Sequence, residues 1–399
     1  MINTDNPVGI APDFSGLVHA GQTNTAEEYA LLDRMGVSWL LATFYWSRIE
    51  PADDQWDFDW YDRYVDTAKA AGKKIIGVLG YDVPWIHENE KFSRYIPPDK
   101  MHYFTDFVRQ TAEHFRGRVD AWCIWNEPNF NNWNGSKKDF FTLTGLAAEA
   151  IREADPDVIL LGGAFNRNIT GLPKAYIRGL YESGAMEKTD AVAFHPYELS
   201  PKRTLKLYNA FRKISDVYGF GSRIWITEVG YPTGGWYPTA TTEKKFPAFV
   251  VKTIVKLASE GAQKVMWYQL ADPDVREKRN SENYFGLVRS DNDYTSKGAE
   301  AFRLCALYLS GTVYRPGLPQ HGNLPKTLKA FYFENPGSGG TLVLWKEGKP
   351  VQLNPLQLEL NDPDIVYNLH DPVSGNTVWL GCETDFTVCS MPVFITWGK

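Results

Sequence analysis

The chain alternates short apolar runs with longer amphipathic stretches, and this alternation constrains the fold more than any other feature. The apolar runs are rich in β-branched and aromatic residues, which is typical of strands buried on both faces. The stretches between them repeat apolar residues every three to four positions, as helices packed on a sheet do. The predicted strands lie at residues 14–19, 38–46, 74–81, 121–127, 158–165, 191–197, 224–229 and 264–270. The clearest helical stretches are Thr25–Met35, Asp59–Ala71, Lys138–Ala154 and Thr241–Glu260.

Eight strand and helix units over roughly 310 residues predict an α/β fold, a (β/α)8 TIM barrel, rather than an open doubly wound sheet. The first predicted strand is not followed by Gly-x-Gly-x-x-Gly, which argues against a dinucleotide-binding domain. After about residue 310 the pattern changes to short strands separated by turns that contain proline and glycine. These strands are predicted at residues 328–333, 341–345, 365–369, 378–380 and 393–397.

Two domains follow from this pattern: a (β/α)8 barrel at residues 1–311 and a small, antiparallel, β-sandwich-like accessory domain at residues 312–399. The accessory domain is expected to cover barrel surface, and the alternative is a separate sugar-binding module.

Composition limits the classes of partner. The net charge of −6 argues against a nucleic-acid partner, for which a basic surface is expected. No apolar run reaches the length of about 18 residues that a membrane span needs. The N-terminus lacks a basic region followed by an apolar core, so no signal peptide is recognised. Localisation stays open between cytoplasmic and secreted, because a signal peptide that has been removed would leave the same pattern.

The four cysteines, Cys123, Cys305, Cys382 and Cys389, show no C-x-x-C spacing, so the sequence predicts neither a zinc site nor another metal site. Cys382 and Cys389 could pair across a hairpin, or both could be buried free thiols.

The predicted strand at 121–127 ends in Asn126, Glu127 and Pro128. Pro128 cannot continue the ladder because it has no N–H, so Glu127 should lie at the C-terminal end of a strand. The structural alternative is a carboxylate that caps the next segment. However, Asn126 places a neutral donor and acceptor beside the acid, and the flanking tryptophans offer sugar-stacking area and a low dielectric that raises a carboxyl pKa. We therefore expect Glu127 to be the acid that keeps its proton.

A second acid, Glu228, occupies the same place at the end of the predicted strand 224–229. The C-terminal ends of all strands in a parallel barrel meet at one face, so Glu127 and Glu228 can be neighbours in space. Glycosidic cleavage needs two carboxylates at one cleft: one protonates the leaving oxygen, and the other attacks the anomeric carbon or activates water.

Other strand ends supply candidate substrate-binding residues. Arg48 follows the second strand and could keep the nucleophilic carboxylate ionised, or it could pair with Glu50. Tyr197 could donate its hydroxyl to the nucleophile, and His195 could bind a sugar hydroxyl or be a satisfied core histidine.

Aromatic residues near the strand ends are candidates for sugar stacking. Trp267, at the eighth strand, could form the floor of a sugar site or pack in the core. Tyr81 and Trp85 follow the third strand and could line the cleft. Trp236 lies in the loop after the seventh strand and could touch sugars beside the cleaved bond.

These motifs resemble those of the clan A glycoside hydrolases. Trp125-Asn126-Glu127-Pro128 is similar to the acid/base motif of the clan, and Thr227-Glu228-Val229-Gly230 is similar to its nucleophile motif. The segments 46–51 and 80–85, together with the trailing β domain, are most similar to family 39, whose members are β-xylosidase-like or endoglycosidase-like. Many clan members have a histidine at the end of the third strand, where this chain has Tyr81 and Asp82.

The resemblance implies a retaining hydrolase acting on an oligosaccharide or polysaccharide. In this mechanism Glu228 is the nucleophile, Glu127 is the acid/base, Asn126 binds the 2-hydroxyl of the sugar, and no cofactor is needed. Two alternatives are a transglycosidase that uses the same residues and a non-catalytic carbohydrate-binding barrel. The sugar, the linkage, endo or exo action and the oligomeric state do not follow from the sequence.

Overall fold

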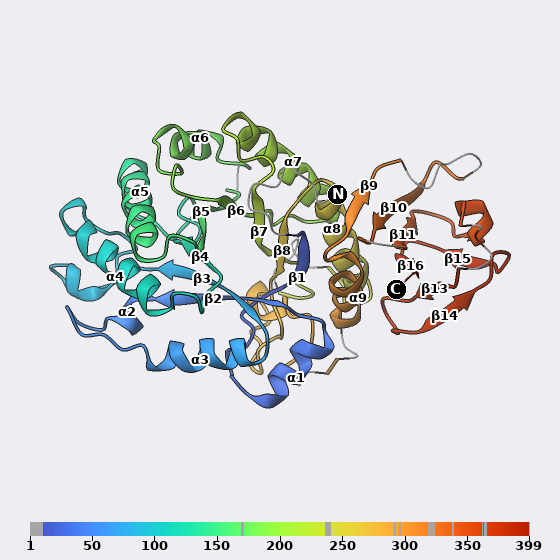
Figure 1. The fold of residues 1–399 in the computed structure, drawn as a ribbon, viewed down its shortest axis with the longest axis horizontal. Coiled ribbons are helices and arrows are strands. Elements are labelled where there is room, and N and C mark those ends of the chain that lie inside the picture. Colours follow the sequence, from blue (N-terminus) through green and yellow to red (C-terminus); the bar gives the residue numbers. More distant parts are fainter. Residues whose placement is uncertain are drawn as a thin grey trace.

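The computed structural model describes residues 11–168, 171–235, 241–290, 293–294, 297–317, 324–336, 339–360, 362 and 365–398. Eight parallel strands form a closed barrel in chain order, in which β1 pairs with both β2 and β8. A separate antiparallel sheet lies to one side of the barrel (Figure 1). The predicted fold class, a TIM barrel followed by a small antiparallel β domain, is confirmed. The barrel strands are β1 Asp13–Val18, β2 Trp39–Tyr45, β3 Lys74–Gly80, β4 Ala121–Ile124, β5 Ile159–Asn166, β6 Ala191–His195, β7 Ile224–Val229 and β8 Lys264–Trp267.

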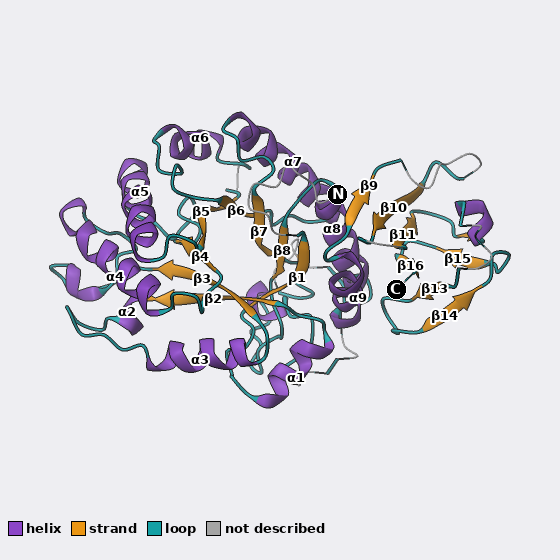
Figure 2. Ribbon diagram, in the orientation of Figure 1, coloured by secondary structure: helices purple, strands orange, loops and turns teal. Residues whose placement is uncertain are grey.

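Helices surround the barrel (Figure 2). In α4 the buried residues Met101, Phe104, Val108 and Thr111 recur every three to four positions, so one face packs on the sheet. None of the helices within the described residues combines the length and the apolar character that crossing a bilayer requires. The helices are α1 Ala26–Arg34, α2 Trp46–Ile49, α3 Asp59–Ala70, α4 Met101–His114, α5 Lys137–Ala154, α6 Lys174–Glu182, α7 Pro201–Val217, α8 Phe246–Ser259 and α9 Ala299–Leu309, with 3-10 turns η1 Pro84–Ile86, η2 Pro98–Lys100, η3 Ser281–Tyr284 and η4 Pro355–Leu358.

Each barrel strand contributes to two apolar layers, because side chains alternate along a strand. In β3, Ile76 and Val78 belong to the cluster inside the barrel, whereas Ile75 and Leu79 belong to the cluster between the sheet and the helices. The interior is therefore a packed core, and functional groups must lie at the ends of the strands.

The C-terminal sheet has six strands in the order β14-β13-β16-β11-β10-β9, and β12 pairs with β15 in a second sheet. In β11, Val343 and Trp345 join the core that the barrel forms with its helices, whereas Leu342 and Leu344 share a cluster with β12 and β15. One face of the six-stranded sheet thus packs toward the barrel and the other toward the small sheet. The strands are β9 Val313–Arg315, β10 Leu328–Glu334, β11 Gly340–Lys346, β12 Val351–Leu353, β13 Tyr367–His370, β14 Thr377–Leu380, β15 Phe386–Val388 and β16 Val393–Trp397.

Some sequence predictions differ from the observed elements. The strand predicted at 121–127 ends at Ile124, because Trp125 and Glu127 take left-handed backbone conformations, with φ of 64° and 47°, that leave the ladder. The three-residue strands β9, β12 and β15 were not predicted. All four cysteines are free, so Cys382 and Cys389 do not pair. The domain boundary at 311/312 and the sandwich-like character of the second domain stay predictions.

A buried lysine lies at the N-terminal end of the barrel. Lys264 is 2% exposed, and its Nζ is 4.6 Å from the centre of the Trp39 ring, 5.6 Å from that of Trp225 and 3.9 Å from Asp13 Oδ2. Burial lowers the pKa of Lys264 to about 8; Asp13 opposes the shift and Lys74 adds to it. Because the unfolded chain binds this proton more tightly, the folded protein should become more stable as the pH rises from about 8 toward 10.

Lys264→Met should remove this pH dependence. Between pH 7 and 9, the free energy of unfolding of the unsubstituted protein should rise by roughly 1 kcal/mol relative to that of the variant. Urea unfolding at the two pH values measures the difference. Lys329→Met, at an exposed lysine of β10, is the control and should keep the dependence. If the free energy of unfolding changed equally with pH in Lys264→Met and in the unsubstituted protein, Lys264 would not be the buried group whose pKa is lowered.

Candidate active site

The backbone leaves β4 in a turn that places Glu127 at the C-terminal end of the barrel. The Glu127 N–H donates to the carbonyl oxygen of Ala164 at 3.0 Å. Ala164 lies at a register shift in β5, where Gly163 and Ala164 have φ of 93° and 43°. A bulge of this kind, common next to active sites, thus fixes the residue that carries the first acid.

Two N–H groups hold the carboxylate of Glu127. Its Oε1 accepts a hydrogen bond from Asn166 Nδ2 at 2.8 Å and lies 2.7 Å from His195 Nδ1. Asn129 fixes Asn166, since its amide bonds both the backbone N–H and the carbonyl oxygen of Asn166, at 3.0 and 2.7 Å. Sequence reasoning missed Asn166 and Asn129. Their signal was available: Asn166 follows the predicted strand 158–165 directly, as the other candidates follow theirs.

Glu228 lies in β7, one residue before its end. Its Oε2 accepts a hydrogen bond from the Tyr197 hydroxyl at 2.9 Å and lies 3.6 Å from His195 Nδ1. One ligand atom each of Glu127, His195 and Glu228 lie within 4.8 Å of one another. The structure therefore brings the two acids, His195 and Tyr197 together at one end of the barrel.

His195 is 1% exposed and lies close to both acids. Its Nδ1 faces Glu127, and its Nε2 lies 2.9 Å from Thr227 Oγ1. Protein oxygens thus engage both ring nitrogens, and the predicted bond from His195 to a sugar hydroxyl stays a prediction.

The protonation of the site follows from burial and charge. Burial raises the pKa of Glu228 to about 7, the charges of Glu127 and Glu282 add to the rise, and His195 and the Tyr197 hydroxyl oppose it. Burial alone would lower the pKa of His195, but the charge of Glu228 and the hydrogen bond and charge of Glu127 raise it. The expectation that Glu127 is the acid that keeps its proton stays a prediction.

A further aromatic residue and a third carboxylate complete this end of the barrel. The Tyr268 hydroxyl donates to Glu282 Oε2 at 3.1 Å, and the Tyr268 ring packs edge-on against Tyr197 and Phe285. Burial, with the charge of Glu127 adding, raises the pKa of Glu282, and the Tyr268 hydroxyl opposes the rise. Neither Tyr268 nor Glu282 was among the predicted site residues.

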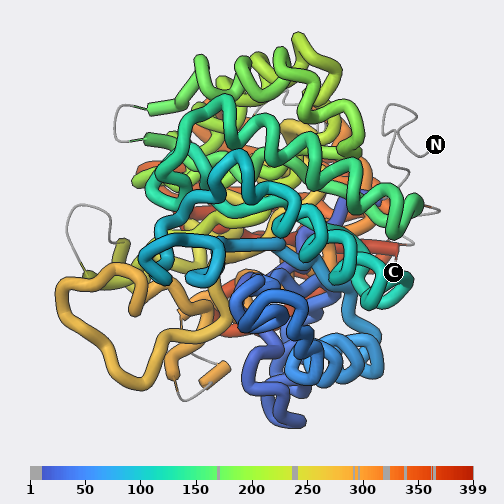
Figure 3. Tube along the Cα trace, turned by 90° about the vertical axis from the view of Figure 1, so that its left-hand side faces the viewer, coloured from blue at the N-terminus to red at the C-terminus, as the bar shows by residue number. Residues whose placement is uncertain are grey.

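Glu282 belongs to the long segment between β8 and α9, which projects from the barrel in the yellow to orange part of the trace (Figure 3). A fully buried ion pair holds this segment in place. It joins Lys297 and Asp272 with an N–O distance of 2.8 Å. Asp272 also accepts from the Gly286 N–H at 2.8 Å, which closes the loop that carries Glu282.

The structure does not bring Trp267 to the acids. Trp267 is completely buried against Tyr231 and Phe246 on the outer side of the barrel wall. Since side chains alternate along β8, Met266 and Tyr268 face inward instead. Trp267 thus packs in the core, the alternative that the sequence left open, and Tyr268 is the aromatic residue of β8's end that faces the acids' side of the barrel.

Arg48 and Trp85 also lie elsewhere. Arg48 is exposed, with its guanidinium carbon 4.5 Å from the centre of the Trp60 ring. The carboxylate of Glu50 accepts from Trp46 Nε1 and the Asp54 N–H instead of pairing with Arg48. Trp85 is half-buried and donates to the carbonyl oxygen of Glu50 at 3.2 Å. Trp236 lies outside the described residues.

Tyr81 lies beside the acids. Its hydroxyl hydrogen-bonds the side chain of Asn126, and burial together with the charges of Glu228 and Glu127 raises its pKa. Its ring meets that of Trp125 edge-on, with ring centres 5.3 Å apart. Tyr81 and Asn126 thus extend the site from the acids toward the ends of β2 and β3.

Within the part of the chain that the structure describes, Glu127, His195 and Glu228 lie close enough together to bind one metal ion. The prediction that the site needs no metal or cofactor stays a prediction.

Comparisons with known proteins find similarity to glycoside hydrolases. The profile of glycoside hydrolase family 42, described as beta-galactosidase, matches residues 19–79. Endo-1,4-beta-xylanase B of Thermotoga neapolitana is 25% identical over 210 residues, which cover 48% of this chain and 57% of that protein. Endo-1,4-beta-xylanase A of Phanerodontia chrysosporium is 24% identical over 163 residues, or 38% of this chain and 39% of that protein. The chain thus spans 57% of the length of the first relative and 39% of the length of the second.

Solved structures match nearly the whole chain. A family 39 glycoside hydrolase from Bacteroides cellulosilyticus WH2 has a TM-score of 0.77 at 19% identity, covering 99% of this chain and 81% of that one. A family 39 β-xylosidase from Caulobacter crescentus has a TM-score of 0.67 at 15% identity and covers 98% of both chains. The chain therefore shares the fold of these two structures. More narrowly, the barrel and its trailing β domain share the fold of family 39 structures, which confirms the resemblance drawn from the motifs.

Tyr197→Phe should raise the pKa of Glu228 above about 7. The variant loses the one hydrogen bond that favours the charged carboxylate, and a shift of roughly one unit is expected. An infrared or NMR titration of the carboxyl groups measures it. Tyr268→Phe is the matched control, because its hydroxyl donates to Glu282, and should change the pKa of Glu228 less. A fall in this pKa in Tyr197→Phe would contradict the assigned contact.

Proposed function

We propose that the chain is a retaining O-glycoside hydrolase, in which Glu228 is the nucleophile and Glu127 is the general acid and base. The observation that carries the proposal is the approach of the two carboxylates, because one oxygen of Glu127 lies within 4.8 Å of one oxygen of Glu228. Retaining enzymes hold their carboxyl groups about 5 to 5.5 Å apart, whereas inverting enzymes need about 6.5 to 9.5 Å to admit a water. The short approach supports double displacement.

The surroundings of each acid suit its proposed role. The Tyr197 hydroxyl, which donates to Glu228, stabilises the charged form that attacks the anomeric carbon. Asn166 and His195 hold Glu127 in one orientation, from which it protonates the leaving oxygen and later takes a proton from water.

When attack begins, the two acids must hold one proton between them. That proton must be on Glu127, and Glu228 must be charged. Without substrate the buried Glu228 has the raised pKa. A bound substrate places its leaving oxygen as a hydrogen-bond acceptor for the proton on Glu127, and the charged form of Glu228 then faces the anomeric carbon, where positive charge develops in the transition state.

Asn126 completes the proposed catalytic group by binding the sugar 2-hydroxyl. This bond strengthens in the oxocarbenium-like transition state, so it lowers the barrier rather than only tightening ground-state binding. Tyr81, hydrogen-bonded to Asn126, orients the amide. We assign this chemistry to residues 1–311 and an accessory role to residues 312–399.

The names of the relatives narrow the substrates to test. Matching proteins are named as xylanases, β-xylosidases and a β-galactosidase. We therefore propose a β-linked oligosaccharide or polysaccharide, and 4-nitrophenyl β-xyloside, β-galactoside and β-glucoside together with xylan form the first panel. Release of nitrophenol or reducing sugar reports hydrolysis.

Azide should distinguish the roles of the acids in alanine variants. With Glu228→Ala, azide can enter the vacated space and give a glycosyl azide of inverted configuration on a substrate with a good leaving group. With Glu127→Ala the covalent intermediate still forms, and azide should intercept it to give the retained configuration. NMR of the products reads the stereochemistry.

Glu282→Ala is the control, since it removes a neighbouring carboxylate that has no proposed covalent role, and it should give no glycosyl azide. Opposite stereochemistry in the two main variants would reverse the assignment. If neither Glu127→Ala nor Glu228→Ala lost more than about tenfold in turnover, a barrier change near 1.4 kcal/mol, the proposed function would be wrong.

A further inference from the structure

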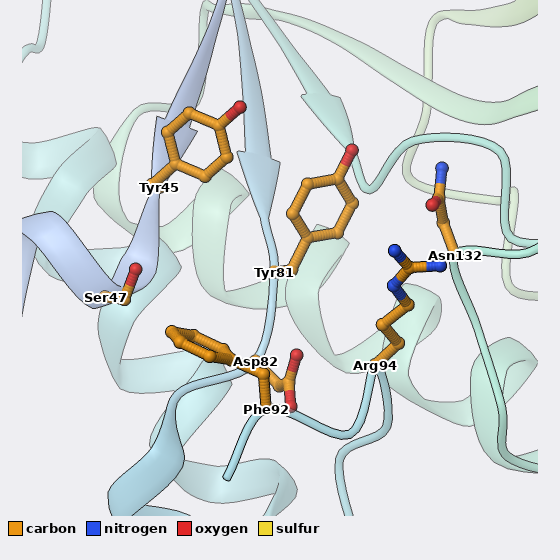
Figure 4. Close-up of a pocket in the computed structure, with 7 residues that line it drawn as sticks. All are labelled: Tyr45, Ser47, Tyr81, Asp82, Phe92, Arg94 and Asn132. Atoms are coloured by element: carbon orange, nitrogen blue, oxygen red, sulfur yellow. The ribbon is translucent and has the colours of Figure 1, made fainter.

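A cavity of about 360 Å³ opens beside the proposed catalytic group, at the ends of β2 and β3. Its volume lies within the range of small-molecule sites. Figure 4 shows Tyr45 and Tyr81 side by side, with Phe92 below them and Arg94 reaching toward Asn132. The cavity is lined by Tyr45, Ser47, Tyr81, Asp82, Phe92, Arg94 and Asn132.

Tyr81 connects this cavity with the acids. The ring of Tyr81 lines the cavity, while its hydroxyl contacts the side chain of Asn126 and feels the charges of Glu127 and Glu228. The leaving group of the proposed reaction lies beside Glu127, whose carboxylate is held by Asn166 of β5 and His195 of β6. The cavity lies instead at the ends of β2 and β3, next to the sugar that Asn126 is proposed to bind.

The far wall of the cavity is fixed by a buried carboxylate. Asp82 is 2% exposed, and its Oδ2 accepts from the Ser93 N–H at 2.6 Å and lies 2.9 Å from His87 Nε2. This contact anchors Ser93, so its neighbours Phe92 and Arg94 are held at the cavity.

The next loop fixes the same segment from the other side. The Asn134 N–H donates to the carbonyl oxygen of Arg94 at 2.8 Å, and Asn134 Nδ2 donates to that of Ser93 at 2.6 Å. Arg94 is held in the left-handed region, with φ of 53°, which a residue with a side chain rarely adopts without support. The wall is therefore preformed.

The cavity presents the groups that a sugar ring needs. Phe92 and Tyr45 are 62% and 44% exposed, which is unusual for large aromatic side chains and offers faces for the apolar side of a pyranose. Arg94 Nη1 donates to the carbonyl oxygen of Asn131 at 2.7 Å, and the rest of its planar fork can bond neighbouring ring hydroxyls. Asn132 adds an amide on the same side.

We propose that this cavity binds a second sugar ring of the substrate, the unit attached to the non-reducing side of the sugar whose bond is cleaved. Phe92 and Tyr45 stack on the ring and Arg94 binds its hydroxyls. The inference rests on the proposed function and narrows it: the preferred substrate carries at least two sugars on the glycone side.

The test compares kcat/KM for 4-nitrophenyl β-xyloside and 4-nitrophenyl β-xylobioside, which differ only by that second ring. The unsubstituted enzyme should prefer the xylobioside. Phe92→Ala and Arg94→Met should each reduce this preference by about tenfold, the size expected for one lost stacking or charged hydrogen-bond contact, and should leave the xyloside rate nearly unchanged. Arg94→Met keeps an unbranched side chain, so the fork alone is tested.

Trp379→Ala is the control, because Trp379 is a similarly exposed aromatic residue, at 64%, on β14 of the C-terminal sheet. It should leave the preference unchanged. If the substitutions at Phe92 and Arg94 lower the rates of both substrates equally or of neither, the second-ring site is wrong, while hydrolysis of either glycoside still upholds the proposed function. Retained turnover in the Glu127 and Glu228 variants would instead overturn the proposed function itself.

Discussion

The contact between His195 and the two carboxylates is the interaction on which the proposed active site depends. Two acids buried at one end of the barrel repel each other, and isolated burial of either charge would be costly. His195 Nδ1, 2.7 Å from Glu127 and 3.6 Å from Glu228, supplies a donor to one acid and positive character to both. Thr227, one residue before Glu228, holds the other ring nitrogen. The imidazole thus links β6 to β7 and to the turn after β4.

The barrel makes this contact possible because its closure brings distant strand ends to one face. Local departures from regular strands then aim the side chains. Glu127 has a left-handed backbone and donates to Ala164 at the bulge of β5, and β7 has its own register shift next to Glu228. Buried polar contacts fix the surrounding loops, through Asp82 at one side of the site and through the ion pair of Asp272 and Lys297 at the other. Such a site is largely formed before a substrate arrives.

The sequence alone predicts much of this arrangement, because periodicity determines which elements form and strand ends in a barrel must converge. The barrel and the grouping of Glu127, Glu228, His195 and Tyr197 follow from that logic. Trp267 does not, since one residue of alternation decides whether a side chain faces the core or the site, and Tyr268 takes its place. Glu282 lies in an irregular segment without a periodic signal. The raised pKa of Glu228 depends on burial and on neighbouring charges that no spacing reveals.

The central claim, that Glu228 attacks the anomeric carbon, is tested most directly by trapping the covalent intermediate. A 2-deoxy-2-fluoro glycoside with a good leaving group slows release of the glycosyl group from the enzyme, because the fluorine destabilises the oxocarbenium-like transition state. Mass spectrometry of the digested protein then locates the added sugar. A single adduct on the peptide that contains Glu228 is expected. An adduct on the Glu127 peptide, or turnover that gives a product of inverted configuration without any adduct, would contradict it.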